Sequence, residues 1–316
     1  MIEPIKIYND TNRFTIDWTL NTLCTYHCSY CHPSLHMGKN IFKDKVADNQ
    51  LISNFLQRLY NALKGRPVHM WLNGGEPTIS PVFETIIDFV DQVGWHAHVN
   101  TNGSRSLAWW QEYAKKIYKV TISYHPESVI DEEIFEKVEY IGNQTNVGVF
   151  TLMYPPLWSK AVSAYERFKS MERVTIAPSR VFKRQEMQVA NSYEYSQDQL
   201  DWLEKNSNVI FRPGVRPESP KNSYGRTYVE YDDGTVELLD EVEFTNNRKN
   251  KFISWKCSMG RNHIFINGNW EISHATCGTA RRFTTVDKFV TLPDHDVVCK
   301  SEYCMCTADV LIPKYK

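Results

Sequence analysis

Short strand-like runs alternate with amphipathic helical stretches through the first 200 or so residues, and this alternation constrains the fold most strongly. In the stretches 51–63 and 82–93 apolar residues recur at three- and four-residue spacing, which is typical of helices packed by one face. Repeated βα units build a parallel sheet with helices covering it. The predicted strands are residues 14–20, 68–73, 95–101, 117–124, 146–153 and 173–178, and further helices are expected at 107–117, 131–141, 158–171 and 196–206.

Six βα units are fewer than the eight of a closed TIM barrel, so we expect an α/β fold with an open, partial (β/α)6 TIM-like barrel over residues 1–210. Residues 211–226 are rich in proline and glycine and read as a connection. Beyond them, Asp233-Gly234 and Asn267-Gly268 separate alternating runs and predict β-hairpins. The sequence therefore predicts a small β-hairpin, cysteine-rich module over residues 227–316.

Composition narrows the class of protein further. The 316 residues are 42% hydrophobic and carry a net charge of −1, which fits a globular core and excludes a broadly basic surface. The amino terminus has no signal-like apolar run, and the longest apolar run, 147–154, is too short to span a membrane. We expect a cytoplasmic protein without a membrane span. Eight cysteines in that reducing compartment favour metal binding or redox chemistry over disulfides.

Three of these cysteines, Cys24, Cys28 and Cys31, follow the first predicted strand with C-x3-C-x2-C spacing. Thiolates so close on one loop can bind a single centre, and loops at the carboxyl ends of barrel strands build active sites. A structural zinc site normally has four ligands in pairs. An iron-sulfur cluster with one iron left without a protein ligand fits three thiols better, although the spacing alone leaves zinc open.

A second motif makes the chain resemble the radical SAM superfamily. Tyr30 is the aromatic residue usual before the last cysteine of that family's C-x3-C-x2-C signature, and Gly74-Gly75-Glu76-Pro77 matches its GGEP motif at the end of the second strand. In the family the open iron chelates the amino and carboxylate groups of S-adenosylmethionine (SAM), and GGEP binds the amino group. Glycine lets the backbone approach a ligand closely, and a carboxylate complements an ammonium. The matching motifs and strands follow one another in the family's order from residue 14 to about residue 182.

Weaker matches lie at the ends of later strands, where family members place ribose and carboxylate contacts. They are Asn102, within "VNTNGS", and Ser123 and His125, within "TISYHPES". A turn at Asn102 and a local hydrogen bond at Ser123 are the alternatives. Arg180, beyond the sixth strand, is expected to pair with the SAM carboxylate or a substrate anion, or to be an exposed surface residue.

The C-terminal cysteines resemble the auxiliary-cluster modules called SPASM and, in shortened form, twitch. A 4Fe-4S cluster takes at most four protein thiolates, so one of the five is spare. Cys257 and Cys277 are the expected pair, completed by two or more of the others. Structural zinc or free thiols are the alternatives. The candidate ligands are Cys257, Cys277, Cys299, Cys304 and Cys306.

The resemblance implies reductive cleavage of SAM to a 5'-deoxyadenosyl radical that abstracts a hydrogen from a substrate. It also implies a SAM-binding 4Fe-4S cluster, a second auxiliary 4Fe-4S cluster, SAM itself, and a reducing partner such as flavodoxin or ferredoxin. The protein's own contribution would be geometry and exclusion of solvent. Whether the reaction is an isomerisation or an oxidation is open at this stage.

The substrate class is also open. Residues 180–226 interleave basic and aromatic side chains, which suits a nucleotide or a modified DNA base, but acidic residues in the same segment favour a solvated mixed-charge surface. Small twitch proteins of this kind look like bacteriophage enzymes that hypermodify thymine, which would place the protein in the host cytoplasm. Peptide modification (epimerisation, crosslinking or dehydrogenation), small-molecule dehydrogenation and a non-enzymatic iron-sulfur scaffold are the alternatives.

Overall fold

The computed structural model describes residues 2–9, 12–31, 48–183, 191–215, 226–240, 244, 249–277, 279–304 and 307–316. Cys306 lies outside these residues. The chain forms two compact units. The barrel unit comprises Thr19–Asn49 and Trp71–Pro217, and the cysteine-rich unit comprises Met1–Trp18, Gln50–Met70 and Glu218–Lys316. The second unit thus includes two N-terminal segments that the sequence assigned to the barrel, and the predicted domain borders stay a prediction.

Neighbouring strands of the barrel unit are hydrogen-bonded in the order β2-β3-β4-β5-β6-β7, and β4 to β7 pair in parallel. Each strand coincides with a predicted one to within a few residues at its ends, because β-branched and aromatic runs between turn residues identify buried strands well. Their bounds are β2 Phe14–Asn21, β3 Val68–Gly74, β4 His96–Thr101, β5 Lys119–Tyr124, β6 Asn146–Met153 and β7 Val174–Arg180.

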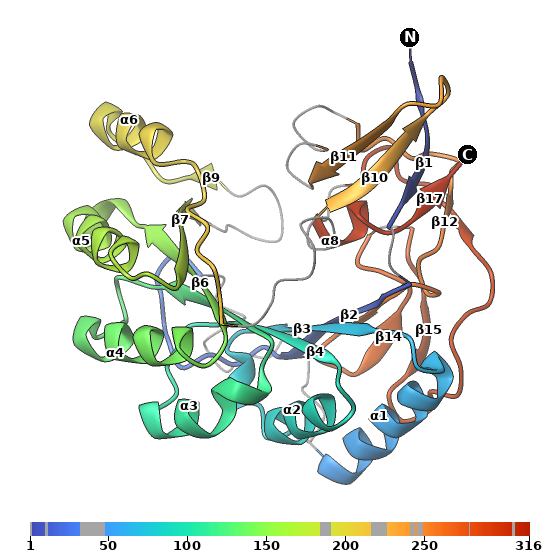
Figure 1. Ribbon diagram of the computed structural model, residues 1–316, viewed down its shortest axis with the longest axis horizontal. Helices are drawn as coiled ribbons and strands as arrows, with labels where there is room; N and C mark the ends of the chain where they lie inside the picture. Colours follow the sequence, from blue (N-terminus) through green and yellow to red (C-terminus); the bar gives the residue numbers. More distant parts are fainter. Residues whose placement is uncertain are drawn as a thin grey trace. The chain divides into compact units, whose positions relative to one another are not determined.

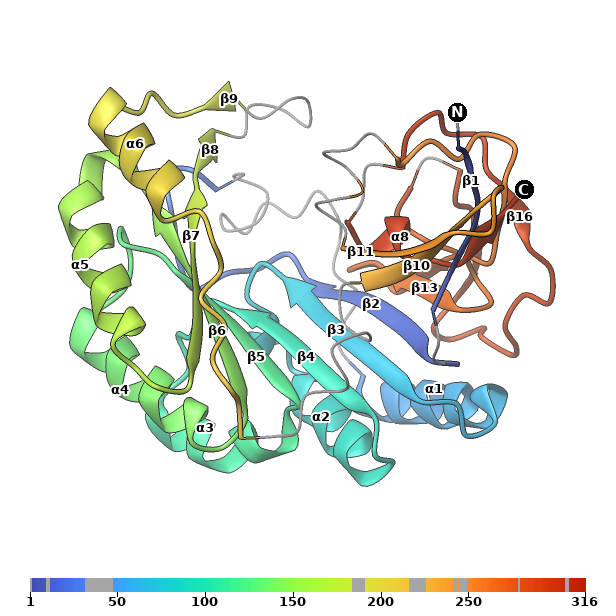
Figure 2. The ribbon, with the colours of Figure 1, turned by 45° about the horizontal axis from the view of Figure 1, so that its top comes forward.

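Helices α2 to α5 cover one face of these strands (Figure 2). The apolar stripe of α2 is buried at Phe83, Ile86, Ile87 and Val90, as its spacing predicts. The helices are α2 Phe83–Gln92, α3 Leu107–Tyr113, α4 Asp131–Gly142, α5 Trp158–Lys169 and α6 Gln197–Lys205. Short 3-10 turns lie at Pro77–Ile79, Ala114–Lys116 and Pro155–Leu157, and strands β8 Phe182–Lys183 and β9 Asn191–Ser192 pair with each other.

The parallel direction of the strands decides where the site lies. The loops that follow β2, β3, β4 and β5 leave the same edge of the sheet. These loops carry the first three cysteines, the GGEP motif, Asn102 and His125. Among the described strands the sheet does not close on itself, since an antiparallel bridge from Ile176 to Ile210 ends the β7 side. The predicted open barrel is confirmed.

The cysteine-rich unit is built mainly from antiparallel strands, and β13 pairs in parallel with the beginning of β2. The chain's first and last strands are paired side by side (Figure 1). One sheet has the order β11-β10-β1-β17-β12-β16, and in the other β15-β14-β13 continues into the beginning of β2. Both predicted hairpins are present, as β10–β11 and β13–β14. The strands are β1 Pro4–Tyr8, β10 Arg226–Tyr231, β11 Val236–Asp240, β12 Lys256–Cys257, β13 His263–Ile266, β14 Glu271–Ser273, β15 Arg282–Thr285, β16 Val297–Val298 and β17 Lys314–Tyr315, with helices α1 Asn49–Leu63 and α8 Thr307–Val310.

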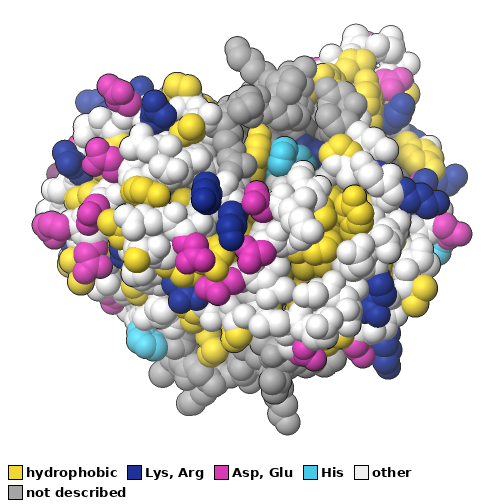
Figure 3. Space-filling model, turned by 60° about the horizontal axis from the view of Figure 1, so that its bottom comes forward, with side chains coloured by type: hydrophobic (Ala, Val, Ile, Leu, Met, Phe, Trp, Pro, Cys, Tyr) yellow, Lys and Arg dark blue, Asp and Glu magenta, His cyan; other side chains and the backbone are white. Residues whose placement is uncertain are grey.

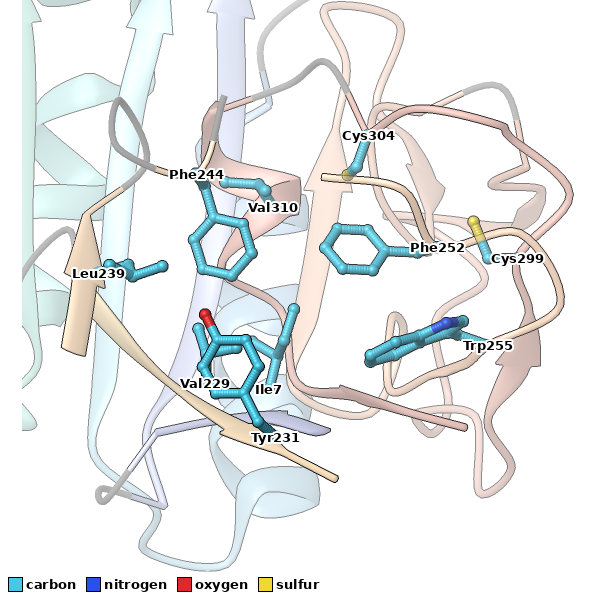
Figure 4. Packing of buried hydrophobic residues seen from close by; sticks show 10 residues of the cluster. All are labelled: Ile7, Val229, Tyr231, Leu239, Phe244, Phe252, Trp255, Cys299, Cys304 and Val310. Atoms are coloured by element: carbon cyan, nitrogen blue, oxygen red, sulfur yellow. The ribbon is translucent and has the colours of Figure 1, made fainter. Parts of the chain in front are cut away.

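Aromatic and aliphatic side chains fill the core of this unit, with Phe244 and Phe252 at its centre and Trp255 beside them (Figure 4). The side chains of Cys299 and Cys304 lie against the same core next to Phe252. Two of the C-terminal cysteines are therefore placed by hydrophobic packing.

The distribution of charge on the surface agrees with the composition. Acidic and basic side chains are interspersed on the face shown in Figure 3, as expected for a net charge close to zero. Within the described part of the chain, no helix is long and apolar enough to cross a membrane.

Candidate functional site

The loop after β2 carries Cys24, Cys28 and Cys31, and polar groups from neighbouring loops approach two of the three sulfurs. Asn102 Nδ2 lies 3.4 Å from Cys24 Sγ, and the backbone N–H of Tyr26 donates to the same sulfur. The backbone of Cys31 donates to Cys28 O, which makes a tight turn between these two cysteines. The loop thus presents its thiols in an arrangement held by strand-end residues.

Cys28 Sγ is buried among hydrogen-bonding and aromatic groups. Ser128 Oγ lies 3.3 Å and His125 Nδ1 3.4 Å from the sulfur, and Tyr30 OH lies 3.1 Å from the same imidazole nitrogen. Burial lowers the pKa of His125 to about 4, so its ring is neutral near pH 7. Tyr154 OH reaches Ser29 Oγ at 2.9 Å, and its ring packs against Tyr30. These aromatic rings form an apolar wall beside Cys28.

Glu76 of the GGEP motif is fully buried, and its carboxylate is occupied by the chain itself. Oε1 accepts hydrogen bonds from Thr78 N, Thr78 Oγ1 and Thr101 Oγ1, and Oε2 accepts one from Asn102 N at 2.7 Å. Burial raises the pKa of Glu76, and these four donors oppose that rise. The carboxylate therefore ties the end of β3 to the end of β4, next to the residue whose amide contacts Cys24.

The two glycines of the motif meet the beginning of the cysteine loop. Gly75 N donates to Asn21 O, Glu76 N donates to Leu23 O, and Asn21 Nδ2 donates to Glu76 O. A Cβ added to Gly74 would lie 2.6 Å from Asn21 O, so only glycine fits there. Pro77 begins the short 3-10 turn for which Glu76 is the N-cap. The motif and the cysteine loop are thus held together by backbone hydrogen bonds.

The other site residues predicted in the N-terminal part of the chain lie at the ends of strands or beside the cysteine loop. Asn102 is brought together with Cys24 and Glu76, and His125 with Cys28 and Tyr30. Ser123 is half-buried on β5 and pairs in register with Phe150. Arg180 is exposed as the last residue of β7. Their contacts with SAM stay predictions, as do the ligand roles of the cysteines.

The C-terminal cysteines converge from four separate segments. Cys257, Cys277, Cys299 and Cys304 line one small cavity together with Asp309 and Lys314. Cys257 ends β12, Cys277 follows β14, Cys299 follows β16 and Cys304 precedes α8. Four thiols is the number that a fully protein-ligated 4Fe-4S cluster takes. Cys306 lies outside the described residues, so its ligand role stays a prediction.

Backbone hydrogen bonds hold two of these cysteines firmly. Cys304 N donates to Asn250 O, and Asn250 Nδ2 returns a bond to Cys304 O at 2.9 Å. Cys299 N donates to Trp255 O and its carbonyl accepts from Ser254 N. Burial raises the pKa of the Cys257 and Cys277 thiols and raises that of Cys304 to about 12. Without a cation to bind, these thiols stay protonated, and a metal must displace the protons.

Sequence reasoning missed Ser128 and Lys314. Ser128 is the last residue of the "TISYHPES" match, but a serine at the end of a loop carries no signal of its own. Lys314 reads as one more basic residue in the tail, and no local pattern marks it as buried. Two aromatic residues of the segment 180–226, Tyr195 and Trp202, pack against neighbouring parts of the chain. Tyr195 OH donates to Met153 O, and Trp202 packs against Trp158 and Tyr165.

The donor sets fit iron-sulfur clusters in number and type. Each thiolate of a cubane cluster binds a different iron, so the ligands surround the group instead of meeting at one atom. Among the residues that the structure describes, no three His, Cys, Asp or Glu side chains are grouped as ligands of a metal ion. Three thiols near hydrogen-bond donors and four thiols around one cavity are arrangements that can surround clusters.

Comparison with solved structures identifies the fold. The AdoMet-bound structure of native anSMEcpe matches 87% of this chain and 79% of its own at 14% identity, with a TM-score of 0.50. Streptococcus suis SuiB matches 87% of this chain at 12% identity and a TM-score of 0.48, and this chain spans only 64% of SuiB. BtrN in complex with AdoMet and 2-DOIA matches 54% of this chain and 72% of its own at 12% identity and a TM-score of 0.35.

No protein-family model matches the chain, and neither does any curated protein. The likeness to anSMEcpe is therefore one of fold. It agrees with the open α/β barrel predicted from the alternating strands and helices.

Proposed function

We propose that this protein is a radical SAM enzyme that binds SAM at a 4Fe-4S cluster held by Cys24, Cys28 and Cys31. One observation carries the proposal: the loop with these cysteines is hydrogen-bonded to the Gly74–Pro77 turn at the carboxyl edge of a parallel sheet. The fold shared with AdoMet-bound anSMEcpe supports it. Three thiols leave one iron of a cubane for SAM, and neither a structural zinc site nor a scaffold needs that vacancy.

When bound, the reduced cluster would supply the electron that cleaves SAM, and the resulting radical would take a hydrogen from the substrate. The chain's own residues prepare this chemistry. Gly74 and Gly75 bring the backbone close to the cysteine loop. The Glu76 carboxylate holds Asn102 in place by accepting a hydrogen bond from the Asn102 backbone N–H. The rings of Tyr30 and Tyr154 exclude water from the side of Cys28.

The second part of the proposal is an auxiliary 4Fe-4S cluster bound by Cys257, Cys277, Cys299 and Cys304. These four thiols share one cavity, and four thiolates are enough to ligate one cluster. Cys257, Cys299 and Cys304 are buried against apolar side chains and Cys277 is half-buried, which limits the access of water to a cluster bound there.

We propose that the radical abstracts a hydrogen from a nucleotide or a modified DNA base. Peptide modification and small-molecule dehydrogenation are the alternatives. The internal packing of Tyr195 and Trp202 leaves fewer rings available for stacking, whereas Phe211 is 75% exposed. Deuterium transfer from labelled candidates into 5'-deoxyadenosine identifies the substrate directly. A reduced flavodoxin or ferredoxin is the expected electron donor.

Anaerobic reconstitution tests the proposal. The protein should take up about eight irons per chain, as two 4Fe-4S clusters require. Dithionite and SAM should then yield 5'-deoxyadenosine, and Cys28→Ala should abolish the product. A fully reconstituted protein that binds no SAM and forms no 5'-deoxyadenosine would refute the enzyme function.

A further inference from the structure

Lys314 is a buried lysine in the wall of the cysteine cavity. Only 2% of its side chain is exposed, and it lines the cavity with the four cysteines. Nζ donates to three backbone carbonyls, those of Asp309, Val310 and Ile312, at 2.6, 3.2 and 2.8 Å. It also lies 5.0 Å from the ring centroid of Phe252, the side chain that Figure 4 shows beside Cys299 and Cys304.

The charge of Lys314 has no carboxylate partner in the described part of the chain, where its ammonium forms no ion pair within 4.0 Å. The Asp309 carboxylate is instead engaged by Thr276 Oγ1 at 2.9 Å and lies 3.8 Å from His263 Nε2. Carbonyl dipoles and an aromatic face compensate a buried cation only in part. A buried charge of this kind normally has a counter-charge nearby.

The strand register directs Lys314 towards the cysteines. In the antiparallel pair β12–β17, Cys257 lies directly opposite Lys314. Directly opposite residues project their side chains to the same face of a sheet. The positive charge of Lys314 lowers the pKa of Cys257 and of Cys304, against the larger effect of burial. Lys314 thus favours the thiolate form of these two cysteines, whereas the Asp309 carboxylate, which lines the same cavity, raises the pKa of Cys304 and Cys277.

We propose that Lys314 is the internal counter-ion of the auxiliary cluster, which stabilises the bound cluster and raises its reduction potential. This inference rests on the auxiliary cluster of the proposed function. Four thiolates give a bound cluster a net negative charge, and reduction adds one more. A fixed buried cation therefore favours the reduced form, and the low dielectric of the core strengthens the effect.

Potentiometric titration of the reconstituted protein, followed by the EPR signal of each reduced cluster, tests the proposal. Lys314→Met and Lys314→Gln remove the charge, Gln keeping a donor for the carbonyls, and Lys314→Arg retains it. At a fixed potential the neutral variants should show at least a tenfold lower ratio of reduced to oxidised auxiliary cluster, about 59 mV for one electron. A chelator should also remove their auxiliary iron faster.

Lys256→Met is the matched control. Lys256 precedes Cys257 on the same strand, but its side chain is exposed and it pairs with Tyr315. Its removal should leave the potential unchanged, because water screens its charge. The N-terminal cluster serves as a second control, since its potential should be the same in every variant.

The outcomes separate the two proposals. Wild-type potentials in both neutral variants would overturn the counter-ion role while leaving the auxiliary cluster intact, and an equal shift in Lys314→Arg would show that packing, not charge, matters. Loss of the auxiliary cluster in the neutral variants alone would support the role. A wild-type protein that assembles only the N-terminal cluster would overturn the counter-ion role together with the auxiliary part of the proposed function.

Discussion

Replacing Glu76 by glutamine separates two roles for the GGEP carboxylate. If the carboxylate acts mainly through the four hydrogen bonds that it accepts from Thr78, Thr101 and Asn102, Glu76→Gln destabilises the fold whether or not SAM is present. If it acts mainly as a SAM ligand, the substitution weakens SAM binding and leaves stability unchanged.

The magnitude follows from the geometry. Glutamine keeps one acceptor oxygen, which the Thr78 and Thr101 donors occupy, so its NH2 group faces the Asn102 N–H that now lies 2.7 Å from Oε2. The hydroxyls can rotate, but the backbone N–H cannot, and a buried donor left without a partner costs about 1–3 kcal/mol. With a urea slope of about 3 kcal/mol per M, the unfolding midpoint falls by about 0.3–1 M.

Urea unfolding followed by far-ultraviolet circular dichroism, with and without SAM, measures the effect. Glu194→Gln, on an exposed carboxylate, is the control and should change the unfolding free energy by no more than about 0.5 kcal/mol. The reasoning is refuted if Glu76→Gln unfolds at the wild-type urea concentration while SAM binding is lost.

Three further predictions concern single side chains. Gly74→Ala places a Cβ 2.6 Å from Asn21 O, so it should cost about 1–3 kcal/mol of unfolding free energy and weaken SAM binding. Gly148→Ala should cost less, because the nearest neighbour of its added Cβ is 3.9 Å away. Urea midpoints and SAM titration compare the two variants. Cys277→Ala should reduce iron from about eight to about four per chain while SAM still binds, and wild-type iron content would show that Cys277 is not a ligand. Burial lowers the pKa of His263 from 6.5 to about 4, so as the pH falls the unfolded chain takes up this proton before the folded chain does. Thermal melts should therefore show a loss of stability between pH 6.5 and pH 4, by up to roughly 3 kcal/mol. The variant His263→Gln should reduce this loss.

Much of the barrel unit could be predicted from sequence, because its elements are local. The runs at 146–153 and 173–178 are strands, and 131–141 is a helix, for reasons contained in a few neighbouring residues. The helix expected over 107–117 ends at Tyr113 and continues as a 3-10 turn, a boundary that residue preferences do not resolve. Cys24, Cys28 and Cys31 are also adjacent enough for their spacing to indicate one shared centre.

The sequence by itself determined the order of βα units, the two hairpins and the cysteine spacing, since each depends on contacts within one short segment. Tertiary structure decided the rest. It brought Cys257, Cys277, Cys299 and Cys304 from four segments to one cavity, and it turned Glu76 inward onto Asn102. It also set Lys314 opposite Cys257 through strand pairing. Burial and pairing between distant segments depend on the whole chain's packing, and no local pattern carries that information.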